Sequence, residues 1–269
     1  MKGPDRRTFV YRTSNALPRR TSTRMKSESD ARGPGFFLDR DGLRAIGLAQ
    51  RASYRAARPS PHAVFDGFLG NEIAIPLAER FPGPEHPGWM RRDYREQAAR
   101  LGQLQRTGFA GVDPGLRHLL AELSGMAFLD FLQALTGVEG LIADPHFRGA
   151  GPSLTLPGGH LALHADFNRD RTRHLERKLT VIYYLGQDWQ PAWGGALELW
   201  DEPRTRCETS YLPVLDRLIV MDHGDTYWHG HPTPLSCPRG RFRASVSAYY
   251  YVAPPAPGED SAHGAIWAV

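Results

Sequence analysis

Two His-x-Asp triplets in the sequence combine residue types that hold divalent metal ions. They are His164-Ala165-Asp166, within the stretch LALHADFNRD, and His223-Gly224-Asp225. Because the chain has 11 His and 17 Asp among 269 residues, about 0.7 such triplets are expected by chance, so the pattern alone is weak evidence. The surroundings of each triplet must therefore decide which of them could bind a metal.

The first triplet lies on a predicted strand, HLALHADF (160–167). Residues two apart on a strand point to the same side, so we expect His164 and Asp166 to face together, with Leu161, Leu163, Ala165 and Phe167 on the opposite side. Two imidazoles and one carboxylate on one face of the metal are the ligands of non-haem Fe(II) oxygenases, which keep further positions open for chemistry. The third ligand must come from a distant strand.

After residue 140 the sequence changes to short segments rich in β-branched and aromatic residues, separated by Gly and Pro turns. These predicted strands are SLTL (153–156), HLALHADF (160–167), KLTVIYYLG (178–186), GALELWD (195–201), RLIVMD (217–222) and RASVSAYYYVA (243–253). Six or more strands without intervening helices favour a double-sheet barrel or jelly roll.

Three segments have the order and spacing of one known family. They are RKLTVIYYLGQDWQPAWGGALELWDEP (177–203), LDRLIVMDHGDTYWHGHP (215–232) and RFRASVSAYYY (241–251). With its surroundings, about residues 141–253, this region resembles the prolyl-4-hydroxylase-like branch of the 2-oxoglutarate/Fe(II)-dependent dioxygenase superfamily. The resemblance implies a double-stranded β-helix (jelly roll, cupin-like) barrel. It also implies Fe(II) and 2-oxoglutarate as cofactors, ascorbate as a further candidate, and O2 with a small-molecule or peptidyl substrate as partners.

The resemblance also implies which residues hold the metal. It assigns His164 and Asp166 as the proximal ligands and His229 as the distal one. His231 is the alternative, because it follows two residues later on the same strand face if the strand persists; we expect it to shape the loop or contact substrate. The triplet at 223–225 is interpreted as a surface turn, because the one histidine beyond residue 232 lies in the tail.

Arg243 matches the family's basic residue for the distal carboxylate of 2-oxoglutarate, which a guanidinium can bind in a bidentate manner. Arg239 and Arg241 are nearby alternatives in the preceding loop. Strand alternation places residues 243, 245, 247 and 249 on one face, so Ser247 could contact the same carboxylate.

Tyr184 matches a tyrosine whose phenol reaches that carboxylate in related enzymes, whereas Tyr183 is predicted to point into the core. The charged segment NRDRTRHLER (168–177) lies beside the expected site. A solvated loop is the favoured interpretation of it, and recognition of an anionic substrate is the alternative.

Helices are predicted before the strands. They cover residues 36–60 with an Asp41 cap, a short apolar stretch in 62–82, a charged exposed stretch in 91–106, and 115–136, which Gly137 ends. The fold class is therefore mostly β with N-terminal helices (α+β). We expect one domain over 36–253, with helical support (36–140) and a β-helix core (141–253), preceded by a disordered leader (1–35) and followed by a loose tail (254–269).

The basic charge is concentrated at the start of the chain. Residues 1–32 carry a net charge of +6, so the rest is −2 within a total of +4, and specific nucleic-acid binding is not expected. The sequence contains no run of 18 apolar residues, so no membrane-spanning helix is predicted. The leader lacks the apolar segment of a signal peptide, and Cys207 and Cys237 are too few for a disulfide framework. Cytoplasmic localisation is therefore predicted, with no membrane partner.

The predicted function is hydroxylation of an unactivated C–H of a prolyl, amino-acid or small biosynthetic substrate, with release of succinate and CO2. Asp166 disfavours chlorination, because halogenases of this superfamily lack the carboxylate ligand; desaturation, ring closure and epimerisation stay open. Two alternatives come from other classes. One is a non-catalytic ligand- or protein-binding β-barrel, and the other is a 2-oxoglutarate-independent cupin metalloenzyme, which has no need of Arg243.

Overall fold

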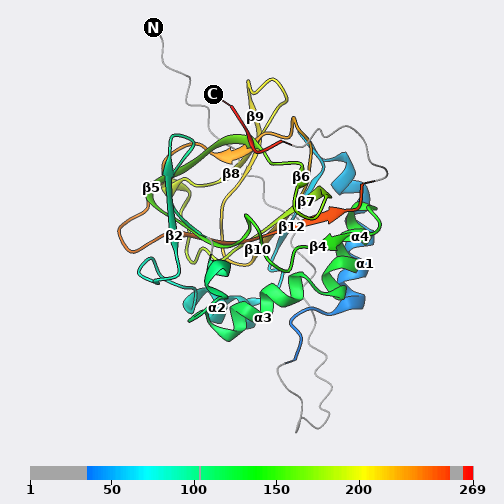
Figure 1. The fold of residues 1–269 in the computed structure, drawn as a ribbon, viewed down its shortest axis with the longest axis horizontal. Helices are drawn as coiled ribbons and strands as arrows, with labels where there is room; N and C mark the ends of the chain where they lie inside the picture. Colours follow the sequence, from blue (N-terminus) through cyan, green and yellow to red (C-terminus); the bar gives the residue numbers. More distant parts are fainter. Residues whose placement is uncertain (1–34, 103, 255–262, 269) are drawn as a thin grey trace.

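The computed structural model describes residues 35–102, 104–254 and 263–268, and the predicted leader (1–35) lies outside them except for Gly35. The described residues form four α-helices and thirteen strands (Figure 1). The helices are α1 (Arg40–Ala56), α2 (Asn71–Glu79), α3 (Pro114–Leu123) and α4 (Met126–Thr136), with short 3-10 turns at Leu104–Thr107 and Pro191–Trp193. The strands are β1 (His62–Asp66), β2 (Met90–Tyr94), β3 (Gln97–Gly102), β4 (Ile142–Ala143), β5 (Gly151–Ala165), β6 (Arg169–Asp170), β7 (Leu175–Tyr184), β8 (Leu197–Trp200), β9 (Cys207–Tyr211), β10 (Arg217–Asp222), β11 (His229–His231), β12 (Arg243–Val252) and β13 (Ile266–Trp267).

The strands form one curled antiparallel sheet in the order β1-β10-β7-β12-β5-β11-β8-β9. Strand β5 joins its two halves, because its first part pairs with β12 and its second part pairs with β11. Between Thr155 and His160 the strand bulges away from β3, whose Ala98 and Arg100 are only two residues apart. The two predicted strands 153–156 and 160–167 are therefore one strand, and the jelly-roll architecture expected from the sequence is confirmed.

The helices cover the outer face of this sheet, below and to the right of the strands in Figure 1. Strand β12 shows how the faces divide. One face packs into the main core (Ala244, Val246, Ala248, Tyr250), and the other lines a pocket inside the barrel (Arg243, Ser245, Ser247, Tyr249). Burial of the apolar face holds the sheet against α3 and α4, and the hydroxyl of Tyr250 donates to the carbonyl of Leu123 at 2.8 Å.

Helices α1 and α4 approach closely. A side chain at Gly47 would meet the carbonyl oxygen of Phe131 at 2.7 Å, so only glycine allows this contact. Arg51 donates to the carbonyl of Ala134 at 2.6 Å and thereby satisfies an open carbonyl at the end of α4. The cap of α1 is Asp39 rather than the predicted Asp41.

Three helix predictions are corrected. Most of the charged stretch predicted as a helix at 91–106 instead forms the β2–β3 hairpin, which ends at Gly102, because pairing of β3 with β5 outweighs its local helical preference. Residues 62–82 begin with strand β1 before α2, and 115–136 breaks at Ser124 and Gly125 into α3 and α4. Among the described residues no single helix is long and apolar enough to cross a bilayer; the pair α3 and α4 meets that test together but is bent by 47°.

Residues 255–262 and 269 of the predicted tail (254–269) lie outside the described residues, whereas residues 266–268 are attached to the sheet. Ile266 and Trp267 form β13 and pair with Ala165 and His164 of β5. The backbone N–H of Ala268 also donates to the carbonyl of Leu163 at 2.9 Å. The prediction of a loose tail is therefore wrong for these residues, because β5 offers them an open edge.

Candidate metal centre and adjoining pocket

Three side chains converge beside the end of β5. His164 lies on β5, Asp166 follows that strand, and His229 begins β11 directly opposite His164. One ligand atom from each lies within 4.8 Å of the others, and among the described residues this is the one group of three His, Cys, Asp or Glu that meets this condition. The structure thus brings together the three predicted ligands.

Both imidazoles are oriented by backbone carbonyls. His164 Nδ1 lies 2.9 Å from the carbonyl of Ala162, and His229 Nδ1 lies 3.0 Å from the carbonyl of Tyr227. Because a carbonyl can only accept, each Nδ1 carries the proton and each Nε2 directs a lone pair toward the centre. Burial lowers the pKa of His229 to about 4, which keeps the ring neutral and able to bind a metal.

Asp166 is held by a buried cation. Its Oδ2 accepts from Arg177 Nη2 at 2.7 Å and from Thr180 Oγ1 at 3.0 Å. The Arg177 guanidinium is fully buried and lies 3.4 Å from the ring centre of Tyr249 and 4.5 Å from that of Phe167. Burial opposes ionisation of Asp166, but Arg177 and the nearby histidines outweigh it and hold the pKa of this carboxyl well below its usual range.

The buried position of Arg177 contradicts the interpretation of residues 168–177 as a solvated loop. The pairing of β12 with β7 skips one residue, because Tyr250 opposes Leu179 whereas Tyr251 opposes Arg177. This bulge turns Arg177 to the same face as Thr180 instead of the core face. Alternation counted along the sequence cannot reveal such a change of face.

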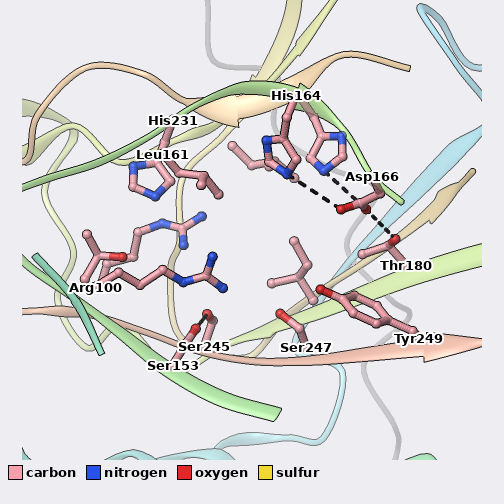
Figure 2. A pocket seen from close by; sticks show the side chains of 15 residues that line it. Arg100, Ser153, Leu161, His164, Asp166, Thr180, His231, Ser245, Ser247 and Tyr249 are labelled. Atoms are coloured by element: carbon pink, nitrogen blue, oxygen red, sulfur yellow. Dashed lines mark hydrogen bonds and ion pairs between the residues drawn. The ribbon is translucent and has the colours of Figure 1, made fainter. Parts of the chain in front are cut away.

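A second bulge corrects the predicted position of Leu161. His229 opposes His164, but His231, only two residues on, opposes Leu161, three residues back. Leu161 therefore lies in the pocket with His164 and not on the opposite side, as Figure 2 shows.

The pocket extends from the metal centre to Arg243, at the start of β12. Arg243 Nε donates to the carbonyl of Gly195 at 2.8 Å, and Nη2 donates to the hydroxyl of Tyr184 at 2.8 Å. Gly194 and Gly195 have φ values of +71° and +73°, and this left-handed backbone turns the Gly195 carbonyl toward the guanidinium. The predicted alternatives to Arg243 at positions 239 and 241 are exposed and do not line the pocket.

The two neighbouring tyrosines of β7 separate as predicted. Tyr184 is buried on the inner side and accepts from Arg243; burial raises the pKa of its phenol, so it keeps its own proton to donate. Tyr183 packs in the outer core and donates to Asp216 Oδ1 at 2.8 Å. Ser247 lines the pocket between the three candidate ligands and Arg243.

His231 lies in this pocket but outside the group of three ligands. It is 3% exposed, and its Nδ1 has no hydrogen-bond partner. Burial, then Arg243 and Arg100, hold its pKa well below the usual histidine range, so the ring is neutral.

The second triplet does not form such a group. His223 Nε2 lies 3.9 Å from Asp225 Oδ1, and His263 of the tail lies 3.0 Å from the same oxygen. Asp225 is exposed. These residues form a polar contact that attaches the tail at the surface.

The sequence interpretation missed several pocket residues, namely Arg100, Ser153, Thr155 and Thr180. Ser153 and Thr155 follow the alternation of their strand and could have been found from it. Arg100 could not, because its segment was predicted to be a helix.

Comparison with known proteins agrees with this geometry. Residues 153–251 match the sequence model of the 2OG-Fe(II) oxygenase superfamily. The matched residues include the three candidate ligands and Arg243, so this part of the chain is similar to that superfamily. The similarity points to a 2-oxoglutarate-dependent dioxygenase, for which Fe(II) and 2-oxoglutarate would be the cofactors. No curated protein sequence matches the chain.

Solved structures share the fold of this protein. A prolyl-4-hydroxylase from Pseudomonas putida is 20% identical with a TM-score of 0.53, over 77% of this chain and 99% of that one. A prolyl hydroxylase from Trichoplax adhaerens, in complex with a hypoxia inducible factor oxygen degradation domain peptide fragment, is 14% identical with a TM-score of 0.55, over 78% and 91%. A prolyl 4-hydroxylase from Phytophthora capsici is 14% identical with a TM-score of 0.52, over 82% and 68%.

The residues of the candidate site fit Fe(II) and 2-oxoglutarate. Two imidazole nitrogens and one carboxylate are suitable donors for Fe(II), and one ligand atom from each lies within 4.8 Å of the others. Arg243 is buried and its two hydrogen-bond partners are neutral, so it can bind a carboxylate.

Proposed function

We propose that this oxygenase is a hydroxylase that inserts oxygen into an aliphatic C–H bond of a prolyl, amino-acid or small biosynthetic substrate. Substrate, 2-oxoglutarate and O2 would give hydroxylated substrate, succinate and CO2, with one oxygen atom of O2 in succinate and the other in the product. The observation that carries the proposal is the group His164, Asp166 and His229 at one end of a pocket that holds Arg243 at the other.

Each residue has a role in this reaction. The Nε2 atoms of His164 and His229 and an Asp166 oxygen would hold the iron, which when bound activates O2 and polarises the keto acid. Arg177 keeps Asp166 ionised and fixes its orientation through the 2.7 Å hydrogen bond. Arg243 would bind the distal carboxylate of 2-oxoglutarate.

Tyr184 and Ser247 would support this carboxylate site. The Tyr184 hydroxyl accepts from Arg243 and keeps a proton that can be donated to the carboxylate. Ser247 lies on the same inner face of β12 as Arg243, and its hydroxyl can donate to the cosubstrate from there.

Asp166 supports hydroxylation over halogenation, because a halide would need the position that the carboxylate takes. Desaturation, ring closure and epimerisation use the same ligands, so product analysis must separate them. Gain of one oxygen atom by the product supports hydroxylation, whereas loss of two hydrogens without oxygen contradicts it. The fold shared with prolyl hydroxylases makes prolyl peptides and free proline the first compounds to screen for stimulated succinate release.

Anaerobic titration with Fe(II) and 2-oxoglutarate tests the cofactor assignment. We expect a weak visible charge-transfer band in the wild-type protein and in His146→Ala, which changes an exposed histidine outside the site. We expect no band in His164→Ala. A wild type without the band would favour a non-catalytic barrel or a metalloenzyme that does not use 2-oxoglutarate, and persistence in His164→Ala would contradict the ligand assignment.

A further inference from the structure

The pocket holds a second guanidinium, that of Arg100, to which the proposed reaction gives no role. Arg100 lies on β3, in the segment that the sequence predicted to be a helix. It opposes Thr155 of β5 from one side, and Arg243 of β12 opposes the same Thr155 from the other. The three residues therefore form one row across three adjacent strands, and all three side chains face the pocket.

Neither arginine of this row has an acidic partner among the described residues. Arg100 Nη1 donates to Gln97 Oε1 at 3.3 Å, and Arg243 donates to a carbonyl and a phenol. Asp166 is the one carboxylate that lines the pocket, and Arg177 already neutralises it. Arg243 is buried and Arg100 is partly buried, so two guanidiniums side by side without a carboxylate bound to either are costly until an anion binds between them.

The surroundings of the row offer further hydrogen bonds to such an anion. Ser153 and Ser245 lie beside Arg100, as Figure 2 shows, and their hydroxyl oxygens are 3.1 Å apart. His231 is at the same end of the pocket, and its buried Nδ1 has no hydrogen-bond partner. His164, Asp166 and Thr180 lie at the opposite end.

We propose that Arg100 and Arg243 together bind the distal carboxylate of 2-oxoglutarate as a two-arginine clamp, with Thr155 between them. This inference rests on the proposed function. Each carboxylate oxygen can accept a hydrogen bond from one guanidinium. This arrangement neutralises the charges of Arg100 and Arg243 better than a single bidentate contact to Arg243 would. A substrate must approach the metal end, so a substrate group that reached Arg100 would have to pass the bound cosubstrate.

Binding measurements with two keto acids test the clamp. The dissociation constants of 2-oxoglutarate and of 2-oxopentanoate, which has the same chain length but no distal carboxylate, are measured anaerobically on the Fe(II)-loaded full chain by the charge-transfer band. We expect Arg100→Gln to weaken 2-oxoglutarate binding by about 10-fold to 100-fold, the range for a hydrogen bond to a charged group. We expect its affinity for 2-oxopentanoate to stay within about 2-fold of wild type, because the lost contact does not exist for that ligand.

Two further variants serve as controls. Arg95→Gln removes the same charge from an exposed position in the same hairpin and should leave both dissociation constants unchanged. Arg100→Lys keeps the charge but not the fork of donors, so a smaller loss for 2-oxoglutarate alone is expected, and this variant also serves if Arg100→Gln does not fold.

Several outcomes would overturn the clamp. Equal loss of both keto acids would show that Arg100 only supports the fold. Unchanged 2-oxoglutarate affinity with a raised KM for the hydroxylated substrate would place Arg100 at the substrate instead. Failure of the wild type to bind 2-oxoglutarate would refute the proposed function itself, a result distinct from a wild type that binds while Arg100→Gln is unaffected.

Discussion

The two faces of the barrel strands share one backbone but differ in function: the outer face packs against the helices, and the inner face lines the pocket. On β7 and β12, the outer face packs apolar side chains against the helices, and the inner face presents arginine, serine, threonine and tyrosine to the pocket. Neighbours in sequence therefore differ in what they determine. Outer residues should control the free energy of unfolding, and inner residues should control metal and cosubstrate binding, so each kind of substitution should leave the other property nearly unchanged.

The largest expected effect separates two inner histidines of β11. His229→Ala should reduce metal affinity by more than about 100-fold, because it removes one of three ligands. His231→Ala should keep metal affinity within a few-fold of wild type, since His231 is not in the ligand group. Titration of each variant with Fe(II) or Co(II) measures the difference. A stronger loss in His231→Ala would reverse the assignment of the third ligand.

The next effect concerns the outer face of β5. Leu154 is fully buried between the pocket residues Ser153 and Thr155, and its own side chain packs in the outer core. Leu154→Ala should lower the free energy of unfolding by about 2–5 kcal/mol, measured by urea denaturation. The folded variant should still bind Fe(II) and 2-oxoglutarate like the wild type. Loss of binding in the folded protein would mean that the two faces are not independent.

Arg177 tests how far orientation of a ligand matters. Arg177→Gln removes the cation that holds Asp166, and we expect metal affinity to fall by about 10-fold to 100-fold, as for other residues that orient metal ligands. Thr180→Val should have a smaller effect in the same direction, because it removes only the 3.0 Å hydrogen bond. Metal titration of folded variants checks both. Unchanged affinity in Arg177→Gln would limit its role to packing.

The smallest effect on cosubstrate binding is expected from one of two adjacent tyrosines. Tyr184→Phe should weaken 2-oxoglutarate binding by a few-fold, roughly one neutral hydrogen bond, with little change in stability. Tyr183→Phe should lower the free energy of unfolding by about 1.5–3 kcal/mol, through loss of the hydrogen bond to Asp216, with cosubstrate affinity unchanged. The reverse pattern would show that the inner and outer faces of β7 have been assigned the wrong way round.

Local patterns were enough for much of the fold and the site. The strands near 178–186, 217–222 and 243–253 were predicted from β-branched runs between turns, and β7, β10 and β12 confirm them. Alternation from Arg243 to Tyr249 also placed that face in the pocket. The β2–β3 hairpin was missed, because the charged sequence 91–106 has helical preference and its partner β5 is more than fifty residues away.

By itself, the sequence determined the type of chemistry, because a His-x-Asp triplet, a later histidine and a basic last strand occur in order and need only residue identity to be recognised. Only the tertiary structure decided which other groups share the pocket. Two bulges turned Leu161 and Arg177 inward, and pairing of β3 with β5 brought Arg100 into the row of Arg243. These placements depend on long-range hydrogen bonds between strands, and such register has no signature in a local stretch of residues.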